Sequence, residues 1–435
     1  MPIPGFTAEA ALLAAGDVSR LSLKQRASDS PVIERPQPAH ALESSSAVVQ
    51  MRELRRAPDG IPDAPTILAA ARLSLKRLLA IQKPDGSLGY LYHPVEDKWE
   101  EKSNVVRLAG CAYALARAAD FSSLRSERKK ARHGVARLLS FLLGLRADLG
   151  SAGLVFIREP DSVEPWGKLG ATALTALALQ FSVGRRFRAE SDALIGSILE
   201  LQNPDGSFLC GIGRPGSPSA QEYFPGESLL ALARYARRTG EKRASAALAR
   251  AFPYYQAHFD NGPTTAFVPW QTDVWTRVAA WLLDKSIAPL GANRPSVEDL
   301  CGFVFRQVDW LLEYQHTQEL GSPSKYLGGF RAPHAPTSNS ATYIEAIILA
   351  CDASALIGDS ERIARYRDAA LLGFRFLLTL QISPERVSAL PRRELAAGGV
   401  TESLESLRMR CDYDQHFLTA CLTALESPTL FAASE

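Results

Sequence analysis

The sequence predicts an all-α fold, an (α/α)6 toroid built from six helical hairpins. Two kinds of helical segment alternate along the chain, one with a single apolar stripe and one that is apolar on nearly every side. Long loops rich in Gly, Pro and aromatic residues follow segments of the first kind, and shorter connections generally follow the second. This alternation is typical of stacked hairpins, in which one helix faces solvent and the other lines the ring axis.

The outer helices show apolar residues at three- and four-residue spacing with charged residues between them, as in Leu138–Leu143. We expect them at 65–83, 127–146, 188–202, 242–258, 296–317 and 359–381. The inner helices are rich in Ala and Leu on most sides, as in Ala171–Leu179, which predicts burial on most sides. We expect them at 104–119, 168–182, 226–239, 272–284, 341–357 and 412–426.

The long loops that lead from outer to inner helices should gather on one face of the ring, where binding residues usually lie. They are expected at 84–103, 147–167, 203–225, 259–271, 318–340 and 382–411. The last of these is long enough to hold a short irregular lid. The starts of the six inner helices should therefore face one common funnel.

Residues 1–62 are rich in Ser, Pro and Ala and show no helical period, which predicts a flexible N-terminal extension before a single toroid domain at 63–430. Lys and Arg number 49 against 47 acidic residues, and no basic stripe stands out. This balance argues against nucleic acid or an anionic membrane as the main partner. No apolar run approaches the ~20 residues that span a bilayer.

The six cysteines are scattered and include no Cys-x-x-Cys pair. This pattern indicates buried thiols in a reducing compartment, and so a cytoplasmic protein. The chain contains no phosphate-binding glycine loop and no metal-ligand spacing. We therefore expect neither a cofactor nor a metal, and a small molecule or a glycan as the substrate.

Two loops share a Gln-x-Pro-Asp-Gly-Ser pattern, within Leu78–Tyr90 and Ile198–Cys210. In each, the proline blocks continuation of the helix and Asp-Gly makes the turn. The pattern resembles the Gln–Gly–Trp repeats of squalene–hopene cyclases and prenyltransferase-type toroids, with Leu88 and Phe208 in place of the tryptophan. The resemblance implies that these loops staple helix ends and do not carry the chemistry.

Polar and aromatic side chains gather at the start of every inner helix. Ionisable groups inside apolar helices are costly unless they are paired or face water, so the set predicts a polar funnel. A single member can instead cap its helix. In chain order the set is Glu101, Asn104 and Arg107; Trp166 and Lys168; Glu222, Tyr223 and Glu227; Trp270, Gln271, Asp273 and Trp275; Asn339, Tyr343 and Glu345; and Asp412, Asp414, Gln415 and His416.

The segment Asp412–His416 carries the sharpest signal, because its carboxylate and imidazole lie four residues apart on one helix face. A carboxylate beside an imidazole can orient a general base or raise its basicity. A core histidine bonded to a carboxylate is the structural alternative. Arg107 and Lys168 would supply positive charge for an anionic substrate group.

The remaining candidates divide into acids and binding groups. Glu227, Asp273 and Glu345 offer carboxylates on separate helices, as paired acid and base chemistry requires. Aromatic faces suit sugar rings and hydrocarbons equally well. The expected binding side chains, beyond the two cations, are Asn104, Trp166, Tyr223, Trp270, Trp275, Tyr343 and Gln415.

Four inner-helix segments resemble bacterial toroid proteins of the terpene-cyclase and prenyltransferase type: Asn104–Leu115, Gly226–Leu232, Tyr343–Ile347 and Asp412–His416. The Asp-Tyr-x-x-His string is also similar to one near the end of glucuronyl epimerases, whose catalytic domain is an α/α toroid. Class II terpene cyclases carry Asp-x-Asp-Asp, whereas this chain has Asp-Tyr-Asp-Gln. It also lacks the neighbouring Cys-His pair of zinc-dependent lanthionine cyclases.

Three hypotheses follow. The first is an epimerase, lyase or hydrolase acting on a polar or anionic sugar, with His416 as acid or base and Asp412 as its orienting partner. The second is a terpenoid-cyclase-like enzyme with Asp412 or Asp414 as proton donor, which predicts a closed apolar cavity with Asp414 at its top. The third is a peptide-modifying or peptide-binding toroid, since Pro2–Leu12 resembles the start of short bacterial peptides that carry IPGFTAEASL.

Overall fold

A computed structural model of the chain describes residues 60–100, 102–150, 152–160, 162–181, 186–287, 290, 295–331 and 335–432. The chain divides into two units, 1–47 and 48–435, and every described residue belongs to the second. The predicted N-terminal extension, including Pro2–Leu12, therefore lies outside the described residues except for its last three positions, and so does Glu101.

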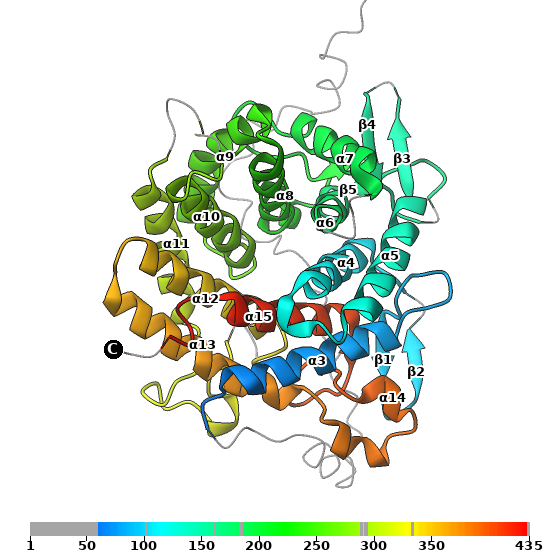
Figure 1. Cartoon of the computed structure of the whole chain (residues 1–435), viewed down its shortest axis with the longest axis vertical. Helices are drawn as coiled ribbons and strands as arrows, with labels where there is room; N and C mark the ends of the chain where they lie inside the picture. Colours follow the sequence, from blue (N-terminus) through cyan, green and yellow to red (C-terminus); the bar gives the residue numbers. More distant parts are fainter. Residues whose placement is uncertain are drawn as a thin grey trace, which may run out of the picture. The chain divides into compact units, whose positions relative to one another are not determined.

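The second unit is an (α/α)6 toroid, which confirms the predicted fold class (Figure 1). Its outer helices are α3 (Ala64–Ala80), α5 (Arg128–Gly144), α7 (Arg188–Glu200), α9 (Lys242–Asn261), α11 (Val297–Leu312) and α13 (Ser360–Leu380). Its inner helices are α4 (Val105–Asp120), α6 (Leu169–Leu179), α8 (Phe224–Thr239), α10 (Val268–Leu283), α12 (Ser340–Leu356) and α15 (Cys411–Glu426). The inner helices contact one another in that order, and α15 contacts α4, so the ring closes.

Short elements fill the loops at the starts of the inner helices. The strands are β1 (Leu91–His93), β2 (Lys98–Glu100), β3 (Arg146–Leu149), β4 (Leu154–Ile157), β5 (Gly167–Lys168), β6 (Gly211–Ile212) and β7 (Met409–Arg410). All pairs are antiparallel, in sheets β2-β1-β7, β3-β4 and β5-β6. The short 3-10 helices η3 (Pro218–Glu222), η4 (Ser324–Tyr326) and η5 (Pro384–Ala389) lie in the same loops, whereas η1 (Ser122–Leu124) connects the end of α4 to α5.

Two predicted helix boundaries are wrong by four or five residues, and the predicted lid also differs from the structure. Helix α10 begins four residues earlier than predicted, because Pro269 sits in its first turn, where the missing N–H costs nothing. Helix α11 ends five residues early, because Gln315 leaves the helix to pair with Phe330. In the 382–411 loop, the short helix α14 (Arg393–Ala396) packs against α3, so this part of the loop is attached to the outer surface of the ring.

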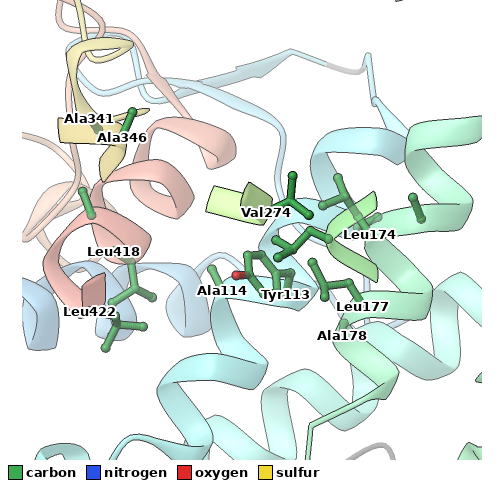
Figure 2. Packing of buried hydrophobic residues seen from close by; sticks show 14 of the residues in the cluster. Tyr113, Ala114, Leu174, Leu177, Ala178, Val274, Ala341, Ala346, Leu418 and Leu422 are labelled. Atoms are coloured by element: carbon green, nitrogen blue, oxygen red, sulfur yellow. The ribbon is translucent and has the colours of Figure 1, made fainter. Parts of the chain in front are cut away.

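The ring is filled by small and aliphatic side chains of the inner helices. Every residue of α6 is buried. In Figure 2, Tyr113 of α4 lies among Leu174 and Leu177 of α6 and Val274 of α10. Burying each such leucine contributes about 1.5–3 kcal/mol. All six cysteines are buried as free thiols, and no helix among the described residues is long and apolar enough to cross a membrane.

Four loops carry the same glutamine staple, two more than the sequence pattern revealed. In each, the side-chain amide donates to the carbonyl of a loop glycine and to a carbonyl of another outer helix, at 2.9–3.2 Å. The glutamines are Gln82, Gln202, Gln315 and Gln381.

The staple at Gln381 joins the last outer helix to the first, through the Ala70 carbonyl of α3. Its partner Gly398 has φ +78°, and a Cβ there would lie 2.6 Å from the Leu73 carbonyl oxygen. Only glycine fits this close approach. The structure thus confirms the stapling role expected of these loops and adds closure of the ring.

Candidate active site at the inner-helix starts

Two arginines hold Asp412, the second residue of α15. Arg410, the last residue of β7, donates to both of its carboxylate oxygens, at 2.5 and 2.9 Å. Arg107 of α4 places its Nε 3.1 Å from Oδ2 and also donates to the Tyr90 hydroxyl. Burial raises the pKa of Asp412, but the two arginines outweigh it, so the net pKa lies below its usual value. Asp412 is therefore ionised at neutral pH.

His416 lies one helical turn further along α15, and its side chain is half-buried. Burial lowers its pKa to about 4; Asp412 opposes the shift, while Arg410 and Arg107 add to it. The imidazole is therefore neutral at pH 7. We call Tyr90, Arg107, Arg410, Asp412 and His416 the mouth cluster.

The structure corrects the expected role of Asp412 as the group that orients His416. The carboxylate oxygens are engaged by guanidinium groups, whose fork matches a carboxylate better than one imidazole N–H does. The Nδ1 atom of His416 instead lies 3.2 Å from Nε2 of Gln415. Asp412 acts on His416 through its charge, which partly offsets the lowering of the imidazole pKa by burial.

Side chains from other inner-helix starts lie within electrostatic reach of this cluster. Tyr223, which precedes α8, is 44 % exposed; burial and Glu222 raise its pKa, and Arg107 lowers it in part. Burial raises the pKa of Tyr343 of α12, and Tyr223 adds to the shift. Arg107 thus acts on groups of α15 and on the residue before α8, which lies opposite α15 in the ring. Arg107 therefore interacts with Asp412, His416 and Tyr223, and Tyr343 interacts with Tyr223; that these residues form one substrate site stays a prediction.

An aromatic layer lies beneath this polar one. The rings of Tyr113 on α4 and Trp270 on α10 approach to 6.3 Å, although these helices are opposite in the ring. Tyr113 is only 2 % exposed. It follows Arg107 by six residues, which places it about 9 Å deeper along the helix at 1.5 Å per residue. Trp270 of the first turn of α10 therefore lies close to a side chain of the opposite inner helix.

Charged side chains lie deeper still and balance one another. Arg117 of α4 is 3.0 Å from Glu345 of α12 and 2.8 Å from Glu426 of α15. Asp273 of α10 pairs with Arg277 one turn later. We call these five residues, together with Arg234 of α8, the axial cluster. Its three arginines offset its three acids.

The axial cluster contains two of the predicted catalytic acids, Asp273 and Glu345. Each is the sixth residue of its helix, one turn deeper than the first-turn residues, and there it neutralises an arginine. Burial raises the pKa of Glu345, and Arg117 lowers it in part. The structure thus separates both acids from the mouth cluster.

Glu227 of α8 is 4 % exposed, and its Oε2 has no hydrogen-bond partner among the described residues. Burial raises its pKa to about 8, so it carries a proton at neutral pH. The lack of a side chain at Gly170 of α6 makes room for it, because a Cβ there would lie 2.5 Å from Oε2. This acid is packed between α6 and α8.

Asp414 lies behind α15 and away from the mouth cluster. It is fully buried, accepts a 2.8 Å hydrogen bond from the Val400 N–H, and interacts with the charge of Arg77 of α3. Burial raises its pKa to about 7. Two residues after Asp412 on a helix, it necessarily faces another direction. The cyclase hypothesis placed Asp414 at the top of a cavity, and this position does not match.

Several predicted binding side chains are already engaged. Lys168 lies 2.7 Å from Glu159, and the Arg214 guanidinium covers the Trp166 ring at 3.0 Å from its centroid. Trp275 is fully buried and donates to Gln271 at 2.8 Å, which corrects its expected role at the site.

Two smaller residues at the starts of α4 and α15 have structural contacts. Asn104 caps α4 by accepting from the Arg107 N–H at 3.2 Å. Gln415 packs on Gly110 of α4, where a Cβ would lie 2.9 Å from its Oε1.

Nothing in the sequence marked Tyr90 or the carboxylate–imidazole pair formed by Glu222 and His258. Their Oε1 and Nε2 atoms are 3.0 Å apart, and Thr264 donates to the other carboxylate oxygen. His258 belongs to the outer helix α9, 36 positions from its partner, so no local spacing could reveal the pair. Within the described ranges, no group of three or more His, Cys, Asp or Glu could hold a metal ion.

No protein-family model matches the chain, and neither does any curated protein sequence. Solved structures do. D-mannose isomerase is similar over 85 % of this chain and 100 % of its own (TM-score 0.57, 13 % identity). A sugar epimerase from a ruminal bacterium is similar over 87 % of this chain and 98 % of its own (TM-score 0.56, 11 % identity). A cellobiose 2-epimerase from Spirochaeta thermophila is similar over 85 % of this chain and 98 % of its own (TM-score 0.56, 15 % identity). At these identities the likeness establishes a common fold.

Proposed function

We propose that the protein is an enzyme that moves a proton at a carbon atom of a polar or anionic sugar, as epimerases and isomerases do. The observation that carries this proposal is the half-buried, neutral His416 beside the arginine-held Asp412. A neutral imidazole accepts a proton without first having to lose one, although the lowered pKa makes it a weaker base than a free histidine.

In the proposed reaction, His416 takes a proton from the carbon next to the sugar carbonyl. The C–H electron pair forms a C=C bond, and the carbonyl π electrons move to the oxygen, giving an enolate. The Arg107 guanidinium stabilises this negative charge. Return of the proton by His416 to the former carbonyl carbon, with the neighbouring hydroxyl proton moving to the enolate oxygen, gives an isomer. Protonation of the original carbon from the opposite face by a second donor gives an epimer, and His416 then releases its proton to solvent.

The surroundings of His416 determine which nitrogen reacts. Gln415 contacts Nδ1, which leaves Nε2 for the substrate. For Nε2 to act as a base, Nδ1 must carry the proton and the Gln415 amide must present its oxygen to it. The Tyr90 hydroxyl, bonded to Arg107, is a second proton donor in the cluster, and burial raises its pKa.

Similarity to known folds supports the sugar assignment. The toroids reported above are a mannose isomerase and two sugar epimerases, which suggests the same class of substrate for this chain. The neutral imidazole then favours proton transfer within that class. The peptide hypothesis gains no support from the mouth cluster, because its titratable groups converge.

Glycoside hydrolysis is the second candidate, and one observation favours it. Glu227 is protonated at neutral pH, as a general acid must be. A Bacteroides thetaiotaomicron α-mannanase also has this fold, over 86 % of this chain and 98 % of its own (TM-score 0.55, 9 % identity). Hydrolysis also needs a free second carboxylate. Asp412 is bound by two arginines, so the geometry favours proton transfer.

A sugar panel tests the proposal. Aldoses, ketoses, uronic acids and disaccharides are incubated with the protein, and products are followed by NMR and chromatography. We expect an isomer or epimer of one sugar class, with the rate reduced about 10²–10⁴-fold in His416→Ala, the usual range for loss of a general base. The matched control is His133→Ala, an exposed histidine on α5.

The outcomes separate the candidates. Unreduced conversion by a folded His416→Ala protein would rule out the proposed base. Release of a monosaccharide from a disaccharide, lost in Glu227→Gln and retained in His416→Ala, would establish the hydrolase instead.

A further inference from the structure

A basic pocket lies at the opposite ends of the inner helices. It has a volume of about 320 Å³ and is lined by Gln180, Arg234, Arg237, Arg238 and Trp281. These residues belong to the last two turns of α8, to the last turn of α10 and to the C-terminal cap of α6. Arg238 follows Glu227 by eleven residues, which separates the pocket from the first turn of α8 by about 16 Å. It is therefore distinct from the mouth cluster.

The charge of the pocket is positive. Asp192 lies 3.9 Å from Arg238, and Arg237 donates to the Ser286 hydroxyl at 3.0 Å. The negative end of the α8 dipole explains arginines in its last turn. It does not explain Arg234, which lies one turn earlier.

Arg234 is poorly compensated where it meets the pocket. Burial lowers its pKa to about 10, and the neighbouring cations Arg277 and Arg117 add to the shift, whereas Asp273 opposes it. Glu426 also interacts with Arg234. Its guanidinium lies over the Phe181 ring, 4.2 Å from the centroid. An anion on this side would give the Arg234 guanidinium a further negative partner.

Two side-chain atoms of the lining residues are buried and have no hydrogen-bond partner in the part of the chain that the structure describes. They are the buried Nε of Arg234 and the buried Oε1 of Gln180. The amide nitrogen of Gln180 donates to the Ala231 carbonyl at 3.0 Å, so its oxygen remains the free end. A buried polar atom without a partner is costly, and here one is a donor and the other an acceptor.

We propose that this pocket binds a small anion that also carries hydroxyl groups, of the chemistry and size of a sugar phosphate. The guanidinium groups receive the oxyanion, since their geometry matches phosphate, and the Gln180 oxygen accepts from a hydroxyl. The volume is at the lower end of the ~300–1,000 Å³ typical of small-molecule sites. Arg237 lies over the Trp281 ring at 4.7 Å, which fixes one cation at the wall. The proposal does not depend on the reaction at the mouth cluster.

Calorimetric titration of the full chain tests it, with glucose 6-phosphate, inorganic phosphate and glucose as probes at constant ionic strength. We expect saturable binding of glucose 6-phosphate, weaker binding of phosphate and none of glucose. The double variant Arg237→Ala/Arg238→Ala should lose at least tenfold in affinity for both anions. Gln180→Leu should weaken glucose 6-phosphate binding and leave phosphate binding unchanged.

The matched control is Arg243→Ala, an exposed arginine on α9 that pairs with Glu200. Its affinities should stay within twofold of wild type. Three results would overturn the proposal: no saturable binding, an equal loss in Arg243→Ala, or a loss in His416→Ala with binding retained in the double variant. Phosphate binding as tight as that of glucose 6-phosphate would overturn the hydroxyl component. Melting curves verify that each variant is folded.

Discussion

Replacing Glu227 by glutamine should stabilise the protein at neutral pH and remove much of the pH dependence of its stability. Burial without a hydrogen-bond partner raises the pKa of this carboxyl from 4.5 to about 8. In the unfolded chain the carboxyl ionises at a pH near 4.5, so the stability that the protonated group contributes to the folded state is fully present below that pH. It is lost as the pH rises through about 8.

The magnitude follows from the two pKa values. The pH of 7 lies 2.5 units above the pKa of this carboxyl in the unfolded chain and below its pKa in the folded protein. Ionisation therefore lowers the free energy of the unfolded state by at most about 3 kcal/mol, at 1.36 kcal/mol per unit. Glutamine has nearly the same shape and does not ionise. Glu227→Gln should therefore approach this gain at pH 7 and show less than about 1 kcal/mol at pH 5.

Urea denaturation at pH 5, 6, 7 and 8 measures the effect. Glu319→Gln, at an exposed loop position, is the control and should follow wild type at every pH. If the free energy of unfolding of Glu227→Gln runs parallel to that of wild type across this range, the carboxyl is not buried in its neutral form and the reasoning fails.

Three further substitutions test the packing. Gln381→Leu removes a buried staple and should lower the free energy of unfolding in urea by about 2–3 kcal/mol; an unchanged value would refute ring closure by this residue. Gly170→Ala overfills the α6–α8 contact and should cost about 1–3 kcal/mol in thermal melting, whereas Gly196→Ala, with no atom within 4 Å of its Cβ, should not destabilise. Arg117→Met leaves Glu345 without its counterion and should cost about 3–5 kcal/mol at pH 7; a loss that does not shrink when urea titrations are repeated at lower pH would contradict this cause.

The fold could be predicted because its period is repeated six times. Apolar spacing distinguishes outer from inner helices, and chain order then dictates the ring. Two of the four glutamine staples were not predicted, because the loops after Gln315 and Gln381 lack the Pro-Asp-Gly-Ser string. They keep only the glutamine and a glycine 13 or 17 positions later.

The candidate site was predicted less completely, because spacing within a helix determines the face on which a side chain lies but not the residues that it contacts. Asp412 and His416 share a face at four-residue spacing, and the same rule directs Asp414 elsewhere. The partners of Asp412 come from β7 and α4, and Arg107 lies about 300 positions away in the chain. Only the closed ring brings it to α15.

Solvent deuterium incorporation tests the central claim most directly, namely that His416 moves a proton at a sugar carbon. The converted sugar is incubated in D2O with wild type, His416→Ala and the exposed-residue control His133→Ala, and deuterium at the carbon next to the carbonyl is followed by NMR. We expect deuterium at that carbon with wild type and His133→Ala, and a rate at least about 100-fold lower with His416→Ala. Conversion without deuterium at that carbon, or undiminished incorporation by folded His416→Ala protein, would contradict this claim.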